Sequence, residues 1–234
     1  MTKHTPITGQ NRPTHTIEDY LMTMHVMERD QGEIIAARLA ELMDVAPATI
    51  TMTLKRMKRD HWITDTAHKA VRLTETGRAA AHSVARRHML TEWLLVRILK
   101  VPLPLVHEEA HGIEHAISAQ LEERMREILQ DPQVCPHGNP FPGCEQAVSD
   151  WLPLTDIPVG ESVTIRRIHE FAEDNPELLG FLIENNILPG VQTRILSILP
   201  FNQTLSMEVD QKTVTLGFAT AHFIFAERAA KQPA

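Results

Sequence analysis

No apolar run in this 234-residue chain approaches the roughly 18 residues that a membrane-spanning helix needs, so we expect no membrane partner. The first segment, MTKHTPITGQNRPTHT, lacks the apolar core of a secretory signal and predicts a flexible tail over residues 1–15. Two cysteines, Cys135 and Cys144, cannot form a disulfide framework. The reducing cytoplasm is therefore the expected location.

Positive charge is also in short supply. The 23 lysines and arginines are outnumbered by 30 acidic residues, and the net charge of -7 by itself argues against a nucleic-acid binder. The local distribution matters more, however, because one segment is clearly basic. Thirteen histidines are a high count and favour metal chemistry. The remaining composition, 43% hydrophobic and 23% charged, is that of an ordinary globular protein.

The hydrophobic pattern changes its period along the chain. Helical spacing predicts helices over 16–30, 34–43, 48–60, from 74 to about 100, and from about 104 to 130. A Pro/Gly-rich stretch at 131–160 predicts an ordered loop that runs into a linker. Beyond it, alternation predicts strands at 162–168, 191–199, 204–209, 213–216 and 221–225, with a short helix at 176–185. The predicted fold class is mainly α with a small β-barrel domain.

Helices 34–43 and 48–60, joined by a four-residue turn, have the lengths and apolar spacing of a helix-turn-helix. A predicted hairpin around residues 67–69 follows as a wing and carries His68, Lys69 and Arg72. A three-helix bundle with a solvated basic face is the alternative. Pattern, basic helix and wing together favour double-stranded DNA binding. The predicted DNA contacts are Arg38, Ala48, Thr49, Thr51, Met52, Lys55, Arg56 and Arg59.

The start of the second helix lacks a strong hydrogen-bonding reader such as Gln or Arg. Ala48, Thr49 and Met52 instead predict apolar contact with thymine methyl groups and readout of DNA shape.

Potential metal ligands recur at helical spacing. His88 and Glu92 are four residues apart, as are His107 and His111, and Glu114-His115 follows at once. Residues three and four apart share one face of a helix, so each group forms a stripe of nitrogen and carboxylate donors. Two such stripes, joined by a short turn, can face one another and hold metal ions.

The string H-E-E-A-H at 107–111 also satisfies the zinc-peptidase pattern, in which Glu108 would be the general base. The extended form of that pattern fails, because Gly112 follows His111 directly and no histidine stands at the extended spacing. Glu108 lies about 100° round the helix from His107 and need not share the ligand face. A zinc metallopeptidase remains the alternative function, and Glu108→Gln separates the two because it should inactivate only a peptidase.

Several motifs in order resemble the diphtheria toxin repressor family, which includes iron-dependent repressors and manganese transport regulators. They are TIEDYL at 16–21, LTETGR at 73–78, RRHMLTEWLL at 86–95, VHEEAHGIEH at 106–115 and CPHGNPFPG at 135–143, and residues 161–227 resemble its small FeoA-type barrel. The resemblance implies a winged helix-turn-helix domain at 16–78, a helical metal-binding and dimerisation domain at 79–144, a linker at 145–160 and a FeoA-like barrel at 161–228.

The resemblance implies a primary metal site of Asp19, His111, Glu114 and His115. Asp19 stands where manganese-type members have aspartate and iron-type members methionine. At position 111, manganese-type members have glutamate and iron-type members have cysteine, so His111 matches neither type. Met22 replaces a glutamate that manganese-type members use for a second ion.

An ancillary site of His88, Glu92 and His107 is implied as in iron-type members, with a barrel ligand among Glu173, Asp174 and Glu177. The donor set has no thiolate and suits Mn(II) or Fe(II), although Zn(II) or Co(II) would also bind in vitro. Cys135, His137 and Cys144 are residue types that could hold zinc, but the family keeps similar loops without a metal, so these three are expected to pack a turn.

The function implied is a homodimeric regulator of transcription that binds operator DNA when Mn(II) or Fe(II) is bound and controls metal-ion homeostasis or transport genes. Such a protein is not an enzyme and takes no small organic substrate. A third possibility is a DNA binder whose metal is only structural, which metal-independent operator binding would reveal.

Overall fold

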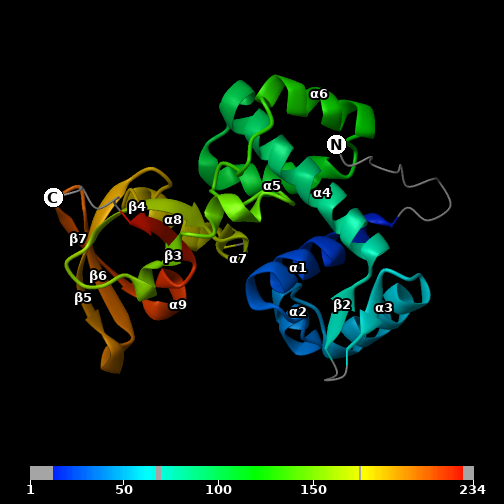
Figure 1. Ribbon diagram of the computed structural model, residues 1–234, viewed down its shortest axis with the longest axis horizontal. Helices are drawn as coiled ribbons and strands as arrows, with labels where there is room; N and C mark the ends of the chain where they lie inside the picture. Colours follow the sequence, from blue (N-terminus) through cyan, green and yellow to red (C-terminus); the bar gives the residue numbers. More distant parts are fainter. Residues whose placement is uncertain (1–12, 67–69, 174, 229–234) are drawn as a thin grey trace. The chain divides into compact units, whose positions relative to one another are not determined.

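The computed structural model describes residues 13–66, 70–173 and 175–228 (Figure 1). The chain divides into two compact units, one up to Arg87 and the other from His88 onward. Most of the predicted tail, residues 1–12, lies outside the described residues. Among the helices that are described, none has the length and apolarity to cross a membrane.

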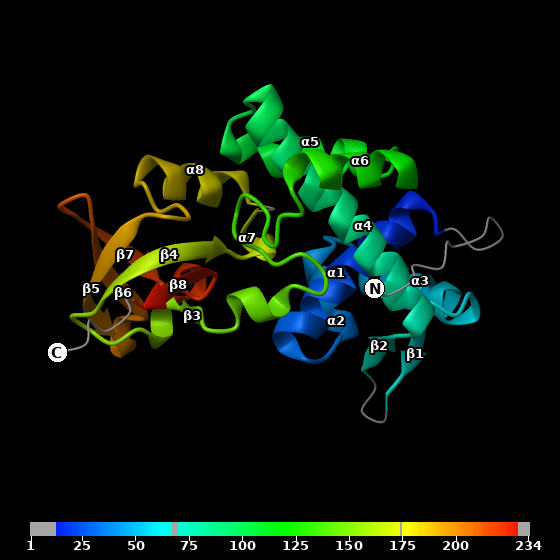
Figure 2. The ribbon, with the colours of Figure 1, turned by 45° about the horizontal axis from the view of Figure 1, so that its top comes forward.

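The first unit contains α1 (His15–Gln31), α2 (Ala36–Leu42), α3 (Pro47–Arg59), strands β1 (Ile63–Asp65) and β2 (Val71–Leu73), and the start of α4 (Glu75–Leu94). One apolar face of α1, which includes Leu21 and Met24, is buried in the core of this unit. The antiparallel strands β1 and β2 lie next to α3 (Figure 2). The three predicted helices and the hairpin are confirmed, with bounds that differ by up to two residues, while the predicted tip at 67–69 lies outside the described residues.

The turn into α4 explains the LTETG motif. The Thr74 hydroxyl accepts a hydrogen bond from the Gly77 backbone N–H at 3.0 Å, as in an N-terminal helix cap. A Cβ atom on Gly77 would lie 1.9 Å from the carbonyl oxygen of Trp62, so only glycine allows α4 to pack this closely against the residue that precedes β1.

The helices of the second unit are the remainder of α4, the π-helical turn η1 (Leu95–Leu99), α5 (Leu103–Glu114) and α6 (Ala119–Leu129). The prediction of one helix from 104 to 130 is wrong. Helix α5 ends at Glu114, and α6 begins after its N-cap residue Ser118. The Ser118 hydroxyl accepts a hydrogen bond from the Leu121 N–H at 3.2 Å. This break ends α5 beside Glu114 and His115, two of the predicted ligands.

The C-terminal part of this unit is a six-stranded antiparallel sheet in the order β3-β8-β4-β5-β6-β7. Its strands are β3 (Leu152–Pro153), β4 (Ser162–Ile168), β5 (Gln192–Leu199), β6 (Thr204–Val209), β7 (Lys212–Gly217) and β8 (Ile224–Arg228). The recorded pairings of the described residues leave β3 and β7 as edges.

Short helices accompany the sheet: α7 (Glu170–Glu173), α8 (Pro176–Glu184) and α9 (Phe218–Ala221), with 3-10 turns η2 (Glu145–Val148), η3 (Leu154–Asp156) and η4 (Pro200–Asn202). The predicted strand at 221–225 is partly wrong, because α9 ends there and β8 begins only at Ile224. Alternating residues such as Ile165, Ile195 and Met207 form the apolar core. Helix α8 contacts α5, so sheet and helices belong to one unit.

Candidate metal centre and nucleic-acid interface

The loop at 135–143 is anchored on β4. Gly138 has φ +92° and donates its N–H to the Cys135 carbonyl at 2.9 Å, which closes a tight turn. A Cβ atom on Gly138 would lie 1.9 Å from the Arg166 carbonyl oxygen. The Ile168 N–H donates to the His137 carbonyl at 2.8 Å. These bonds fix the backbone of His137 and therefore the place of its ring.

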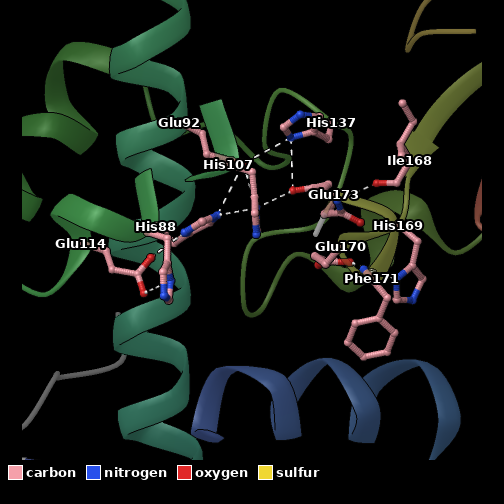
Figure 3. Close-up of polar contacts among 12 residues, drawn as sticks. His88, Glu92, His107, Glu114, His137, Ile168, His169, Glu170, Phe171 and Glu173 are labelled. Carbon is pink, nitrogen blue, oxygen red and sulfur yellow. Dashed lines mark hydrogen bonds and ion pairs between the residues drawn. The ribbon is translucent and has the colours of Figure 1, made fainter. Parts of the chain in front are cut away.

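Five side chains meet in the second unit and are called the buried cluster: His88, Glu92, His107, His137 and Glu173 (Figure 3). They come from α4, α5, the 135–143 loop and α7. His88 Nε2 lies 3.4 Å from Glu92 Oε1 and 3.1 Å from His107 Nδ1.

The remaining distances close the buried cluster. His107 Nδ1 lies 2.9 Å from Glu173 Oε2, and His137 Nδ1 lies 3.2 Å from Glu92 Oε1 and 3.3 Å from Glu173 Oε2. Ligand atoms of a common ion at about 2.1 Å from each would be separated by similar distances. His88, Glu92, His107 and Glu173 offer ligand atoms that all lie within 4.8 Å of one another, which suits one cation, and His137 lies beside Glu92 and Glu173.

The donors of the buried cluster are shielded and incompletely paired. Glu92 is 0% exposed and His137 is 0% exposed. Among the described residues, neither carboxylate oxygen of Glu92 and neither ring nitrogen of His137 has a hydrogen bond of good geometry. Buried polar groups without such bonds cost free energy, and a metal ion would provide their missing partner. Three imidazoles and two carboxylates fit Mn(II), Fe(II) or Zn(II).

Glu173 is held in place from behind. The Asn139 side chain donates to Glu173 Oε1 at 2.5 Å and to the Ile168 carbonyl at 2.8 Å. Arg167 in turn donates to the Asn139 side-chain oxygen at 2.5 Å. One oxygen of Glu173 is therefore engaged, and the other, Oε2, faces the histidines. Such outer partners orient metal ligands.

Electrostatics in the buried cluster favour a cation. Burial lowers the pKa of His88, but Glu92 and Glu114 outweigh it and raise this pKa to about 9. Burial likewise opposes protonation of His137, and Glu173 and Glu92 raise its pKa to about 9. In the metal-free cluster, protons on the histidines thus balance the carboxylates. Metal binding would release them, since an imidazole coordinates in its neutral form.

Cys135 lies beside Glu92 and His137. Burial, together with the nearby carboxylates, raises the pKa of its thiol well above the ordinary value of 9.0. A protonated thiol is a poor ligand, so Cys135 serves in the metal-free protein as an apolar residue of the core beside Met89 and Phe141.

A second group, called the exposed cluster, consists of His111, Glu114 and His115 at the end of α5. Glu114 Oε1 lies 3.5 Å from His111 Nδ1 and 3.6 Å from His115 Nε2. Burial raises the pKa of Glu114, but hydrogen bonds from His111 and His88 lower it to about 2. Glu114 is therefore a carboxylate at neutral pH. Asp19, the fourth predicted ligand, lies half-buried on α1 in the first unit, and its part in this site stays a prediction.

The two histidines of H-E-E-A-H serve different clusters. His107 faces His88 and Glu173, whereas His111 lies beside Glu114. Glu108 is exposed between them. A peptidase would need both histidines on one zinc ion, so this arrangement gives no support to the peptidase alternative.

The second helix of the helix-turn-helix, α3, exposes the predicted DNA-contacting residues. Its inner face buries Ile50, Leu54 and Met57. The exposed residues are Ala48, Thr49, Thr51, Met52, Lys55, Arg56 and Arg59, while Arg38 on α2 is half-buried. Basic and small residues therefore share one accessible face of α3, as a recognition helix in the major groove requires.

Several of these groups already have partners within the first unit. Arg38 pairs with Glu41 at 2.8 Å, Arg59 pairs with Asp60 at 2.7 Å, and Arg56 donates to the Thr14 hydroxyl at 3.2 Å. The Thr51 hydroxyl donates to the Pro47 carbonyl at 2.9 Å. Surface ion pairs of this kind are weak, so the cations can exchange them for phosphates.

Sequence reasoning does not select His137 as a ligand, and the expectation that it only packs its loop misses its contact with Glu92 and Glu173. The available signal is the histidine itself, in a loop that has a turn glycine beside it and three prolines. Of the three suggested barrel ligands, Glu173 lies in the buried cluster, Glu177 is exposed on α8, and Asp174 lies outside the described residues.

Comparisons with known proteins agree with this organisation. Residues 13–71 match the iron dependent repressor N-terminal DNA binding domain, 74–143 match the iron dependent repressor metal binding and dimerisation domain, and 152–228 match the FeoA domain. The three matches follow one another along nearly the whole chain.

Whole-chain relatives give the same result. The chain is 31% identical to the iron-dependent repressor IdeR of Mycobacterium tuberculosis over 93% of its own length and 99% of the relative. It is 31% identical to the diphtheria toxin repressor of Corynebacterium efficiens over 78% of its length and 83% of the relative.

A solved structure of a manganese-dependent transcriptional repressor in complex with manganese is 29% identical, with a TM-score of 0.78 over 91% of this chain and 100% of that one. The chain therefore belongs to the family of iron-dependent, diphtheria toxin repressor-like transcriptional regulators.

Proposed function

We propose that this protein binds operator DNA as a homodimer when Mn(II) or Fe(II) occupies its metal sites, and thereby controls genes of metal-ion homeostasis or transport. The observation that carries the proposal is the buried cluster, where, among the described residues, the carboxylate oxygens of Glu92 and the ring nitrogens of His137 lack hydrogen bonds of good geometry. The relatives named for iron and manganese dependence support the same class of ion.

The proposed ancillary site consists of His88, Glu92, His107, His137 and Glu173. The proposed primary site consists of Asp19, His111, Glu114 and His115. A bound divalent ion would supply the positive charge that holds carboxylates and imidazoles of separate segments in one geometry. Both sets lack a thiolate, which favours Mn(II) or Fe(II), although Zn(II) and Co(II) would also bind.

Asp19 is the ligand that would link the primary metal site to the DNA-binding unit. It belongs to α1 of the DNA-binding unit, whereas the other three residues belong to α5 and its C-terminal end. Ligation by both would restrict the positions that the two units adopt. Metal that favours the DNA-binding arrangement raises DNA affinity, and DNA raises metal affinity by the same factor.

A second copy of the chain is the proposed partner for the helices of the second unit. Large apolar side chains there are exposed at Ile98, Leu99, Leu105, Leu121 and Ile128. Such residues favour association with another copy, and the matched metal binding and dimerisation domain covers all of them. A dimer could present two α3 helices about one DNA turn apart.

Anaerobic titration of the metal-stripped protein with Mn(II), Fe(II) and Zn(II), using the DNA upstream of its own gene, tests the proposal. Binding that appears only with micromolar Mn(II) or Fe(II) is the expected result and identifies the ion. Equal binding with and without every metal would overturn the regulatory role and leave a DNA-binding protein with structural metal. Light scattering of the same samples gives the number of chains in the complex.

A further inference from the structure

Strand β4 contains a β-bulge that turns one arginine away from the apolar core. Ile165 pairs with Ala226 and Arg167 pairs with Phe225, so Arg166 is the extra residue. Consecutive residues of β8 face opposite sides of the sheet, and paired residues share a side. Ile165 therefore faces the core with Ala226, whereas Arg167 shares the side of Phe225. Without the bulge, strict alternation would place Arg167 in the core beside Ile165.

The buried guanidinium of Arg167 contacts the loop at 135–143 and helix α7. Its Nε donates to Asn139 Oδ1 at 2.5 Å, and its Nη2 donates to Glu170 Oε2 at 3.1 Å. Its Cζ lies 4.7 Å from the ring centroid of Phe225. The same loop meets the backbone of the bulge, where a Cβ atom on Gly138 would lie 2.8 Å from Arg167 Cα. The side chain thus joins the sheet to the two segments that supply His137 and Glu173, and all of these residues belong to the second unit.

We propose that Arg167 is a positioning residue of the buried cluster, which presents Glu173 to the metal ion by fixing the side-chain amide of Asn139 and the start of α7. This inference rests on the proposed function, because it requires an ion in the buried cluster. Arg167 acts on that ion through its neighbours and raises the affinity of the site by preparing the ligand before the ion arrives.

Arg167 decides which end of the Asn139 amide faces Glu173. A guanidinium only donates hydrogen bonds, so it meets the amide oxygen, and the amide nitrogen then faces the other way. That nitrogen donates to Glu173 Oε1 at 2.5 Å and to the Ile168 carbonyl at 2.8 Å. Without Arg167 the amide could turn over and place its oxygen against the Glu173 carboxylate, where two acceptors repel. Arg167 thus keeps Asn139 a donor to Oε1 and leaves Oε2 of Glu173 for the histidines of the buried cluster (Figure 3).

The second contact of Arg167 acts on the helix that carries the ligand. Glu170 is the first residue of α7 and Glu173 is the last. Glu170 is buried, and a buried carboxylate is stable only when a charge or a hydrogen bond compensates it. The guanidinium provides both and ties α7 to β4. A ligand held by such outer contacts needs little rearrangement when the ion binds, and these contacts typically change metal affinity by about 10- to 100-fold.

Arg167→Met in the full chain tests the inference, because methionine keeps an unbranched side chain and loses every donor. The metal-stripped protein is titrated calorimetrically with Mn(II), and Co(II) absorption spectra report the geometry around the bound ion. His107→Ala, which lacks a ligand of the buried cluster, identifies the phase of the titration that belongs to this cluster. We expect Arg167→Met to weaken that phase about 10-fold, to change the Co(II) spectrum and to leave the exposed cluster unaffected.

Arg166→Met is the matched control, because the neighbouring arginine pairs with Glu227 in a partly exposed contact. It should bind Mn(II) and Co(II) as the wild type does.

Asn139→Ala breaks the link between Arg167 and Glu173 but keeps the pair of Arg167 with Glu170. It should weaken the buried site by a similar factor, and the double variant should lose little more than Arg167→Met alone, because both changes remove the same chain of bonds. Circular dichroism and thermal melts of the metal-free proteins establish that each variant is folded. Arg167→Lys keeps the test valid if Arg167→Met fails to fold. Lysine retains the charge beside Glu170 but not the planar fork, so a loss of affinity is still expected.

The outcomes separate this inference from the proposed function. A lower melting temperature of the folded Arg167 variant with unchanged affinity and an unchanged Co(II) spectrum would reduce Arg167 to a structural residue and overturn the inference. An equal loss in Arg166→Met, or losses that multiply in the double variant, would also overturn it. Identical titrations of the wild type and His107→Ala would overturn the proposed buried metal site and the inference together. The expected losses combined with DNA binding that ignores metal would uphold the inference and overturn the proposed regulation.

Discussion

The buried cluster and the exposed cluster share helix α5 but differ in how completely the fold builds them. His107 and His111 stand one helical turn apart, yet their side chains are 13% and 51% exposed. The buried cluster takes all five of its side chains from one unit. The exposed cluster has three side chains in that same unit, and its proposed fourth ligand, Asp19, belongs to the first unit.

A metal site that stabilises the fold and a metal site that regulates DNA binding draw their ligands from different parts of the chain. A site assembled within one unit is preorganised and holds its ion with little rearrangement. A site whose ligands come from two units reports on how those units are placed, since metal binding and unit placement are linked. We therefore expect the exposed cluster to control DNA binding and the buried cluster to control stability.

The largest effect is expected from removing a ligand of the primary site. Asp19→Ala and His111→Ala should each weaken metal-stimulated DNA binding by more than about 100-fold, because a direct ligand matters more than an outer partner. The fold should persist, since Asp19 and His111 lie outside the fully buried core. Fluorescence anisotropy with the upstream DNA measures the loss.

Glu108→Gln is the matched control for these two variants, because Glu108 is exposed on the same helix and belongs to neither cluster. It should bind metal and DNA as the wild type does. Unchanged metal-dependent gel shifts from both Asp19→Ala and His111→Ala would remove the distinction between a regulatory and a structural cluster.

His137→Ala should reduce the affinity for DNA less than the two primary-site variants do, but it should strongly reduce the stability that metal adds. The loss of one of five ligands should weaken the buried site by about 10-fold or more and reduce the rise in melting temperature that metal produces. Cys144→Ser, in the same loop segment but outside the cluster, should leave that rise unchanged. Equal metal-induced shifts in both variants would show that His137 is not a ligand.

The pH dependence of the metal-free protein gives a moderate effect. His88 and His137 have pKa values raised from 6.5 to about 9. Their stabilising contribution is fully present below pH 6.5 and is lost as the pH rises through 9. Urea unfolding in the presence of chelator should therefore show lower stability at pH 9 than at pH 6.

Saturating metal should reverse this trend, because neutral histidines coordinate and the ion replaces their charge. His137→Gln provides the control, since one of the two titrating groups is absent and the decline between pH 6 and pH 9 should be shallower. A metal-free protein that gains stability over this interval would contradict the account of the buried cluster.

The smallest effect is expected from Arg59→Ala on α3, which touches neither cluster. Arg59 is exposed and its pair with Asp60 is a surface contact, so stability should change little. Binding to all DNA sequences should weaken modestly, and the slope of log K against log salt should fall by about 1. A loss confined to one operator position would show base contact instead of phosphate contact.

Local patterns were sufficient for much of the fold. Apolar spacing predicts α1, α2 and α3, and strict alternation predicts β4 and β6 with the observed bounds. The long helix from 104 to 130 could not be divided correctly, because the segment between Glu114 and Ser118 contains neither glycine nor proline. The break is visible only in the capping bond of Ser118.

The ligand stripes on α4 and α5 and the basic face of α3 follow from the sequence alone, because helical periodicity is a local property. The separation of His107 and His111 into different clusters, the contact of His137 with Glu173 and the contact of His88 with Glu114 follow from the folded arrangement of the second unit. The contacts that join different elements in the buried cluster, and the contact of His88 with Glu114, link residues 19 to 66 positions apart in sequence, and no local period encodes them.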